Sequence, residues 1–236
     1  MIFEGYNFCA IAGLCILNRG HDCDLNSQER WLRGKQMTIE GGFQGRTNKL
    51  VDSCYSYWQG AAFVVIDMIR RGVRDDFDVN DAGDCISTCQ VCEDDGLADD
   101  VIEVIDPGTR INEVTDSSGG LGFNQRALQR YILHCAQNMT GGLRDKPSKS
   151  RDFYHSCYSL SGLSIAQWFD LNESGQPRSG DEAPKKNVYV YGDSDNVVNR
   201  TSPIFNITSD KLKFALEYFY RDGMICTHDE LLQSEI

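Results

Sequence analysis

The sequence predicts an all-α protein built from repeated helical pairs, and three observations support this prediction. Apolar residues recur at three- and four-residue steps through most of the chain, which is the helical period. Hydrophobic residues make up 41% of the 236 residues, enough for a packed core. A unit made of a Gly-Gly turn, a polar loop and an amphipathic helix occurs twice. Repeated helical pairs stack either into an open solenoid or into a closed ring.

The apolar periodicity predicts six helices. In chain order they cover residues 8–16, 27–35, 52–71, 125–137, 152–169 and 209–220. Gly72 is expected to end the third helix, and Thr208 or Ser209 is expected to cap the last one. Strand-like alternation appears only at Val188–Tyr191, where it is weak.

Two polar segments interrupt the helical pattern. Residues 73–120 are rich in Asp, Gly, Ser and Thr, and we expect them to form an acidic, disordered insertion. Residues 171–187 are expected to form a loop. The chain is therefore divided into helical repeats at 1–72, the insertion at 73–120, and further repeats with C-terminal helices at 121–236.

The charge and the termini exclude several classes of protein. A net charge of −12 disfavours nucleic acid and anionic lipid as partners. No apolar run approaches the roughly 20 residues of a membrane span. The N-terminus has no basic region ahead of an apolar one, so we expect no signal peptide, a cytoplasmic location, and mostly free thiols among the ten cysteines.

The repeated unit places similar residues at equivalent positions one hundred residues apart. Gly41-Gly42-Phe43 leads to Lys49, Asp52 and Tyr55, and Gly141-Gly142-Leu143 leads to Lys149, Asp152 and His155. A partial earlier copy begins at Tyr6. If the repeats close into a ring, the starts of their helices converge on one rim.

Three residues at these helix starts form a candidate metal site. Asp52, Cys54 and His155 offer the oxygen, sulfur and nitrogen donors that tetrahedral zinc accepts, and three protein ligands leave a fourth position open. The spacing alone leaves the alternative open that each residue is purely structural.

Basic and aromatic residues surround the same positions. Cations in the two polar loops would suit a diphosphate, although a solvated loop explains them equally well: Arg46, Lys49, Lys146, Lys149 and Arg151. The aromatic residues are either core residues or the wall of a channel for a long apolar ligand: Tyr6, Tyr55, Tyr57, Trp58, Phe153, Tyr154 and Tyr158.

The two copies resemble a known family closely. Residues 41–59 (GGFQGRTNKLVDSCYSYWQ) and 141–167 (GGLRDKPSKSRDFYHSCYSLSGLSIAQ) resemble the zinc-binding segments of protein farnesyltransferase β subunits, and residues 5–9 (GYNFC) resemble a third block. The resemblance implies an α/α toroid, a ring of helical pairs of which this chain would form an incomplete part.

The resemblance also implies residue roles. The zinc ligands fall on Asp52, Cys54 and His155. The remaining roles are diphosphate binding by Arg46, Lys49 and Tyr55, packing of the isoprenoid on Trp58, Cys9 and Tyr6, contact with both substrates by Tyr154, and magnesium binding near Asp145.

The implied activity is transfer of a farnesyl group from farnesyl diphosphate to the cysteine of C-terminal Cys-a-a-X motifs. It would need one zinc per chain, magnesium at the diphosphate, and a farnesyltransferase α subunit as partner. Asp145 favours this activity over that of the related geranylgeranyltransferase type I, which has a lysine there. Two alternatives stay open: a geranylgeranyltransferase β subunit, and a truncated helical-repeat module that binds a partner without catalysis.

Overall fold

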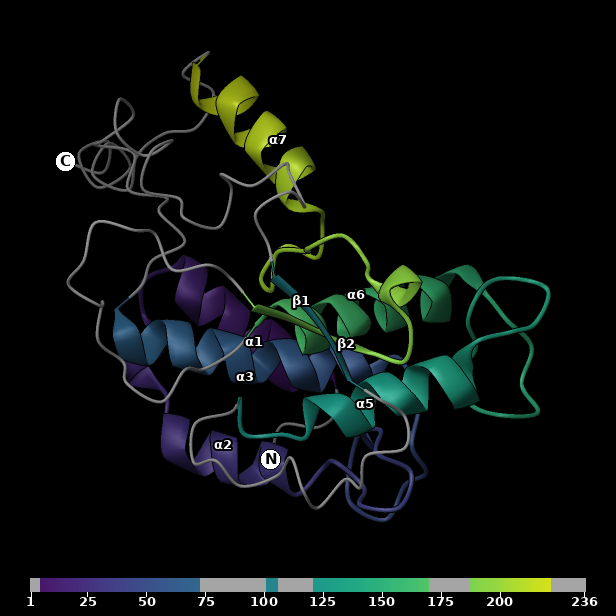
Figure 1. Cartoon of the computed structure of the whole chain (residues 1–236). Helices are drawn as coiled ribbons and strands as arrows, with labels where there is room; N and C mark the ends of the chain where they lie inside the picture. Colours follow the sequence, from purple (N-terminus) through teal and green to yellow (C-terminus); the bar gives the residue numbers. More distant parts are fainter. Residues whose placement is uncertain (1–4, 73–100, 106–120, 170–186, 222–236) are drawn as a thin grey trace, which may run out of the picture.

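The computed structural model describes residues 5–72, 101–105, 121–169 and 187–221 (Figure 1). The longer helices are α1 (Gly5–Ile16), α2 (Leu25–Arg33), α3 (Tyr55–Arg71), α5 (Gln125–Tyr131), α6 (Phe153–Trp168) and α7 (Ser209–Arg221). Shorter turns are η1 (Gly20–Asp22), the π-helix η4 (Ile132–Ala136) and η5 (Ser194–Asn196), and the strands are β1 (Val101–Ile105) and β2 (Asn187–Tyr191). The predicted helical fold class is confirmed.

Helix α3 is the centre of the described core. It packs against α1, α2 and α6, and α5 packs in turn on α6 (Figure 1). Ala61, Val65 and Ile66 of α3 are almost fully buried, with Ile11 of α1 and Ile165 of α6 beside them in one apolar cluster. None of the described helices is long and apolar enough to cross a membrane.

The predicted helices are all present, and their ends follow from capping. The Asp24 carboxylate accepts the Ser27 N–H, so α2 begins two residues before the predicted start. Asp152 caps α6 in the same way, and Gly72, at φ 63°, ends α3 as expected. The predicted helix 125–137 is α5 followed directly by η4.

The close approach of α3 and α6 depends on Gly162. A Cβ atom at Gly162 would lie 2.4 Å from the Cβ of Ser56 and 2.8 Å from the backbone nitrogen of Tyr57. Only glycine therefore lets the first turns of α3 and the middle of α6 pack at this separation. This packing brings the starts of the two helices together.

The loops that precede α3 and α6 have the same backbone structure. Each is closed by an isolated antiparallel bridge, Gln44 with Val51 and Arg144 with Arg151, and Asn48 and Ser148 are both left-handed, at φ 65° and 72°. The predicted repeat is therefore a structural repeat. A similar bridge, Thr201 with Thr208, closes the loop before α7, where the Gly-Gly turn that identified the other copies is missing.

A two-stranded parallel sheet is an addition to the predicted fold. Strand β1 pairs with β2 from Val101 opposite Asn187 to Ile105 opposite Tyr191. The prediction of disorder for 73–120 is therefore wrong at 101–105, where a run rich in β-branched residues (VIEVI) gains a partner strand. Residues 73–100 and 106–120 of the predicted insertion, and residues 171–186 of the predicted loop, lie outside the described residues, whereas Asn187, the last residue of that loop, begins β2. The weak strand pattern at Val188–Tyr191 is confirmed.

A side chain of α5 hydrogen-bonds to the backbone of strand β2. Gln129 of α5 donates to the carbonyl of Tyr189 at 2.8 Å and accepts from the backbone N–H of Tyr191 at 3.0 Å. Val188 and Val190 of β2 are fully buried. The edge of β2 that faces away from β1 is therefore satisfied by a side chain of α5.

Candidate metal centre

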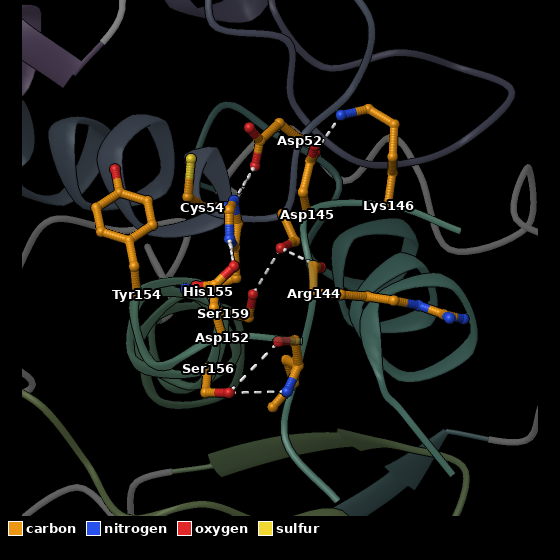
Figure 2. A network of polar contacts seen from close by, with 12 residues as sticks. Asp52, Cys54, Arg144, Asp145, Lys146, Asp152, Tyr154, His155, Ser156 and Ser159 are labelled. Carbon is orange, nitrogen blue, oxygen red and sulfur yellow. Dashed lines mark hydrogen bonds and ion pairs between the residues drawn. The ribbon is translucent and has the colours of Figure 1, made fainter. Parts of the chain in front are cut away.

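Three donor side chains from two distant segments meet at the starts of α3 and α6. Asp52 and Cys54 precede the first turn of α3, and His155 lies in the first turn of α6 (Figure 2). Their carboxylate oxygen, thiol sulfur and ring nitrogen all lie within 4.8 Å of one another. Cys54 is buried, whereas Asp52 and His155 are partly exposed. The donor set predicted from the sequence is thus assembled by the fold.

Asp152 orients the imidazole of His155. One Asp152 oxygen accepts the backbone N–H of His155 at 2.7 Å, and the other lies 2.7 Å from His155 Nδ1. In the tautomer that donates its Nδ1 proton to Asp152, the Nε2 lone pair faces Asp52 Oδ1 at 3.3 Å. Two acceptors that face each other at this distance repel unless a cation lies between them.

One donor–donor separation in this site is consistent with zinc. Bonds of about 2.0–2.1 Å from a tetrahedral zinc to nitrogen and oxygen place those two donors about 3.3–3.4 Å apart. The separation of His155 Nε2 and Asp52 Oδ1, at 3.3 Å, matches this edge of the tetrahedron. A carboxylate held on the second ring nitrogen is also usual for zinc-binding histidines.

The environment of Cys54 favours the neutral thiol unless a cation is bound. Burial raises the pKa of the Cys54 thiol well above its usual value, and the negative charge of Asp52 raises it further. A thiol buried beside a carboxylate ionises only when a cation offsets both effects. A divalent ion held by Asp52, Cys54 and His155 would supply that offset.

An aromatic surface adjoins the candidate metal centre. The Tyr154 hydroxyl lies within hydrogen-bonding reach of Cys54 and accepts a hydrogen bond from Trp58 Nε1 at 3.2 Å. The ring centroids of Trp58 and Tyr158 are 4.4 Å apart, and those of Tyr154 and Tyr158 are 4.7 Å apart. Burial raises the pKa of Tyr154 to about 12, so its hydroxyl stays protonated at neutral pH.

Only some of the residues predicted to contact the isoprenoid lie beside Trp58 in the structure. A Cβ at Gly5 would lie 3.3 Å from the Trp58 ring, so the start of α1 contacts Trp58. Cys9 is exposed on α1, near Tyr158. Tyr6 is 74% exposed, and Phe153, predicted as part of the aromatic group, is 96% exposed and lies outside it.

The predicted diphosphate residues are held by the two repeat loops. Arg46 and Lys49 are exposed and lie one turn apart, joined by a backbone hydrogen bond from the Lys49 N–H to the Arg46 carbonyl. A Cβ at Gly45 would lie 2.4 Å from the Tyr55 hydroxyl, so glycine lets Tyr55 lie against this loop. In the other loop, the Asp145 carboxylate forms an ion pair with Lys146.

Sequence reasoning did not identify the role of Asp152. Its position in the repeat matches that of Asp52, so it was visible in the sequence only as an aligned carboxylate. The signal that could have identified it is its place three residues before a histidine at a helix start, where a capping carboxylate also reaches that side chain.

Comparison with known proteins gives consistent matches. The chain is 34% identical to the protein farnesyltransferase subunit beta of Pisum sativum over 91% of this chain and 53% of the relative. It is 33% identical to that of Arabidopsis thaliana, over 92% of this chain and 46% of the relative. The chain therefore spans about half the length of these curated relatives.

A solved structure, Candida albicans protein geranylgeranyltransferase-I complexed with GGPP, matches with a TM-score of 0.49 and 22% identity. That match covers 95% of this chain and 44% of the solved chain.

The family model of the prenyltransferase alpha-alpha toroid domain matches residues 4–207. This span includes both copies of the loop-and-helix unit and all three donor residues. The match covers most of the chain, and it agrees with the helical pairs seen in the structure. The chain therefore belongs to the prenyltransferase alpha-alpha toroid family.

Proposed function

We propose that this chain forms the zinc-binding part of a farnesyltransferase β subunit, which transfers a farnesyl group from farnesyl diphosphate to the cysteine of C-terminal Cys-a-a-X motifs. The main support is that the donor atoms of Asp52, Cys54 and His155 lie within 4.8 Å of one another, although they come from segments one hundred residues apart. The family match and the names of the curated relatives agree with it.

In this proposal zinc is held by Asp52, Cys54 and His155, with one ion per chain. When bound, zinc supplies a Lewis acid that favours the thiolate form of an acceptor cysteine at neutral pH. Asp152 keeps the Nε2 lone pair of His155 directed at the ion through the 2.7 Å contact at Nδ1. Cys54 is the buried member of the three donors.

The repeat loops and the aromatic surface would bind the isoprenoid diphosphate. Arg46 and Lys49 offer two exposed cations for the phosphates, and the Tyr55 hydroxyl lies against the same loop. Trp58 and Tyr154 present aromatic surface beside Cys54, where an isoprenoid chain can pack. Cys9 and Tyr6, on the exposed side of α1, would extend that surface.

Asp145 bears on the choice of isoprenoid. Its carboxylate is paired with Lys146, and a magnesium ion at the diphosphate would compete with that lysine for the carboxylate. A geranylgeranyltransferase type I would have a lysine at this position, so Asp145 favours farnesyl transfer.

The chain spans about half the length of its curated relatives, so its partners are also proposals. We propose that it acts with an α subunit and that residues 1–72 and 121–236 are the two repeat-containing segments of the site. A helical module that binds a partner without catalysis would be distinguished by a failure to bind zinc.

The decisive experiment is a zinc measurement on the purified chain, alone and co-expressed with an α subunit. About one zinc per chain is expected for a three-ligand catalytic site. Cys54→Ala and His155→Ala should abolish it. The matched variants Cys135→Ala and His134→Ala change a half-buried thiol and an exposed imidazole on η4, away from the donors, and should keep it. Zinc content unchanged by Cys54→Ala would contradict the assignment.

Substrate choice needs a separate assay. The complex should transfer farnesyl to Cys-a-a-X peptides that end in Met or Ser faster than geranylgeranyl to peptides that end in Leu. The opposite preference would identify the geranylgeranyltransferase alternative and leave the zinc assignment intact.

A further inference from the structure

Ser53 lies in the chain between the donors Asp52 and Cys54, and it is fully buried. Its hydroxyl donates to the carbonyl of Arg144 at 2.8 Å. Its backbone N–H donates to the carbonyl of Asp145 at 2.9 Å. Both acceptors belong to the loop of the other repeat. One residue thus makes two hydrogen bonds between loops that are about ninety residues apart in the chain.

Ser159 extends this contact to α6. Its side chain is fully buried and donates to the Ser53 hydroxyl at 2.8 Å. In Figure 2 the Ser159 side chain extends from α6 toward the loop that carries Arg144 and Asp145. Ser159 follows His155 by four residues, so both side chains lie on the same face of α6. A continuous chain of hydrogen bonds therefore runs from the histidine helix through Ser53 to the second loop.

The loop that receives these bonds is fixed from another side as well. The Tyr131 hydroxyl donates to the Asp145 carbonyl at 3.2 Å. The backbone carbonyls of Arg144 and Asp145 both accept hydrogen bonds, which restrict the movement of this loop. A change at Ser53 would therefore move the donor segment 52–54 more readily than the loop it binds.

The repeat itself does not require these hydrogen bonds. The residue aligned with Ser53 in the second copy is Phe153, which is 96% exposed. The residue aligned with Ser159 in the first copy is Gln59, whose amide has no hydrogen-bond partner among the described residues. The serine pair is therefore specific to the place where the two copies meet at the metal donors.

We propose that Ser53 and Ser159 are positioning residues that hold the two halves of the metal centre, Asp52 with Cys54 and His155, at the separation that a shared ion requires. This inference rests on the zinc site proposed above. Metal ligands must be held within about 0.5 Å of the positions that bind the ion. Mutation of the residues that hydrogen-bond to and orient the ligands typically weakens metal affinity about 10- to 100-fold. Ser53 acts on both of its neighbouring donors at once because it shares their backbone.

The test compares zinc affinity with stability in the purified full chain. Ser53→Ala removes the bond to Arg144 and the acceptor of Ser159, while Ser159→Ala removes only the second bond. Ser164→Ala is the matched control, because Ser164 is a fully buried serine of α6 whose hydroxyl accepts one hydrogen bond, from the Thr201 N–H at 2.9 Å, far along the helix from His155. Affinity is measured by competition with a chelator, and Co²⁺ substitution reports ligand geometry through its visible absorption.

We expect Ser53→Ala to weaken zinc binding about 10-fold or more and to alter the Co²⁺ spectrum, with a smaller change for Ser159→Ala. Ser164→Ala should lose comparable thermal stability and keep the affinity and spectrum of the parent chain. In a double variant the effects of Ser53→Ala and Ser159→Ala should be less than additive, since they share one hydrogen bond.

Equal zinc affinities and Co²⁺ spectra for Ser53→Ala, Ser164→Ala and the parent chain would overturn the positioning role. If His155→Ala and Cys54→Ala abolish zinc binding in the same series, only the role of the serines fails. If those two variants also bind zinc normally, the zinc site itself is wrong, and the two failures are thereby distinguished.

Discussion

At the scale of single residues, one position of the repeat serves two purposes. Asp52 and Asp152 are aligned, and each carboxylate accepts a backbone N–H at the start of its helix, from Cys54 at 3.0 Å and from His155 at 2.7 Å. Asp52 also faces the other donors, whereas Asp152 binds His155 Nδ1. The same local structure therefore yields a ligand in one copy and an orienting group in the other.

Asp152→Asn should weaken zinc binding about 10- to 100-fold with little loss of stability. Asparagine caps a helix about as well as aspartate does. Its amide N–H₂, however, would face His155 Nδ1 and favour the tautomer whose Nε2 carries the proton and cannot bind a metal. The measurement is a zinc competition titration alongside thermal unfolding.

The matched control is Asp24→Asn, which makes the same substitution at the cap of α2. Both variants should unfold near the temperature of the parent chain, and only Asp152→Asn should lose zinc affinity. Similar affinities for the two variants would exclude an orienting role for Asp152.

At the scale of helices, the packing of α3 on α6 determines whether the donors meet. Each helix begins at one half of the metal centre, so any change in their separation is transmitted to Asp52, Cys54 and His155. Gly162 allows the close approach at Ser56, whereas Gly60, also on α3 facing α6, leaves room for a methyl group. Alanine substitutions at these two glycines therefore distinguish the effect of helix packing on stability from the effect of helix propensity.

Gly162→Ala should destabilise the fold by about 1–3 kcal/mol and weaken zinc binding, because its Cβ would meet backbone atoms at 2.6 Å and 2.8 Å. Gly60→Ala places its Cβ 3.4 Å from Ile165 and gains up to about 1 kcal/mol of helix propensity, so its stability should stay equal or rise. Urea denaturation and zinc titration of both variants check this. A more stable Gly162→Ala protein with normal zinc affinity would show that the helix separation does not control the site.

At the scale of the whole molecule, large apolar side chains remain exposed on the first and last helices of the described chain. They are Tyr6 and Ile16 on α1 and Phe214, Tyr218 and Phe219 on α7. Figure 1 shows α7 extending away from the core formed by α3 and α6. Exposed apolar side chains grouped on one element are typical of surfaces that bind another protein or helix.

The purified chain alone should therefore self-associate as its concentration rises, and Phe214→Glu with Ile16→Glu should reduce that association. Sedimentation velocity over a range of concentrations measures it. The control is Met139→Glu, which changes a fully exposed apolar residue in the loop between η4 and α6. A parent chain that stays monomeric at every concentration would show that these helix faces do not drive association.

Much of the fold was predictable because helix formation is governed by local patterns. Apolar periodicity located all six helices. Asp24, Asn124 and Asp152 cap the starts of three of them, and Gly72 ends α3. The pairing of β1 with β2 was not predictable, since residues 101–105 lie in an acidic segment and gain their strand conformation from a partner more than eighty residues away. The third loop was also missed, because Thr201 and Thr208 repeat the backbone of the earlier copies without their glycines.

The sequence by itself determined the helical repeat and the chemical types of the three donors, because both follow from residue identity and spacing along the chain. Only the tertiary structure decided that the donors meet, that Asp152 binds the imidazole of His155, and that Ser53 joins the two loops. Those distinctions depend on distances between segments one hundred residues apart, which are set by the packing of α3 on α6 at Gly162 and by no local pattern.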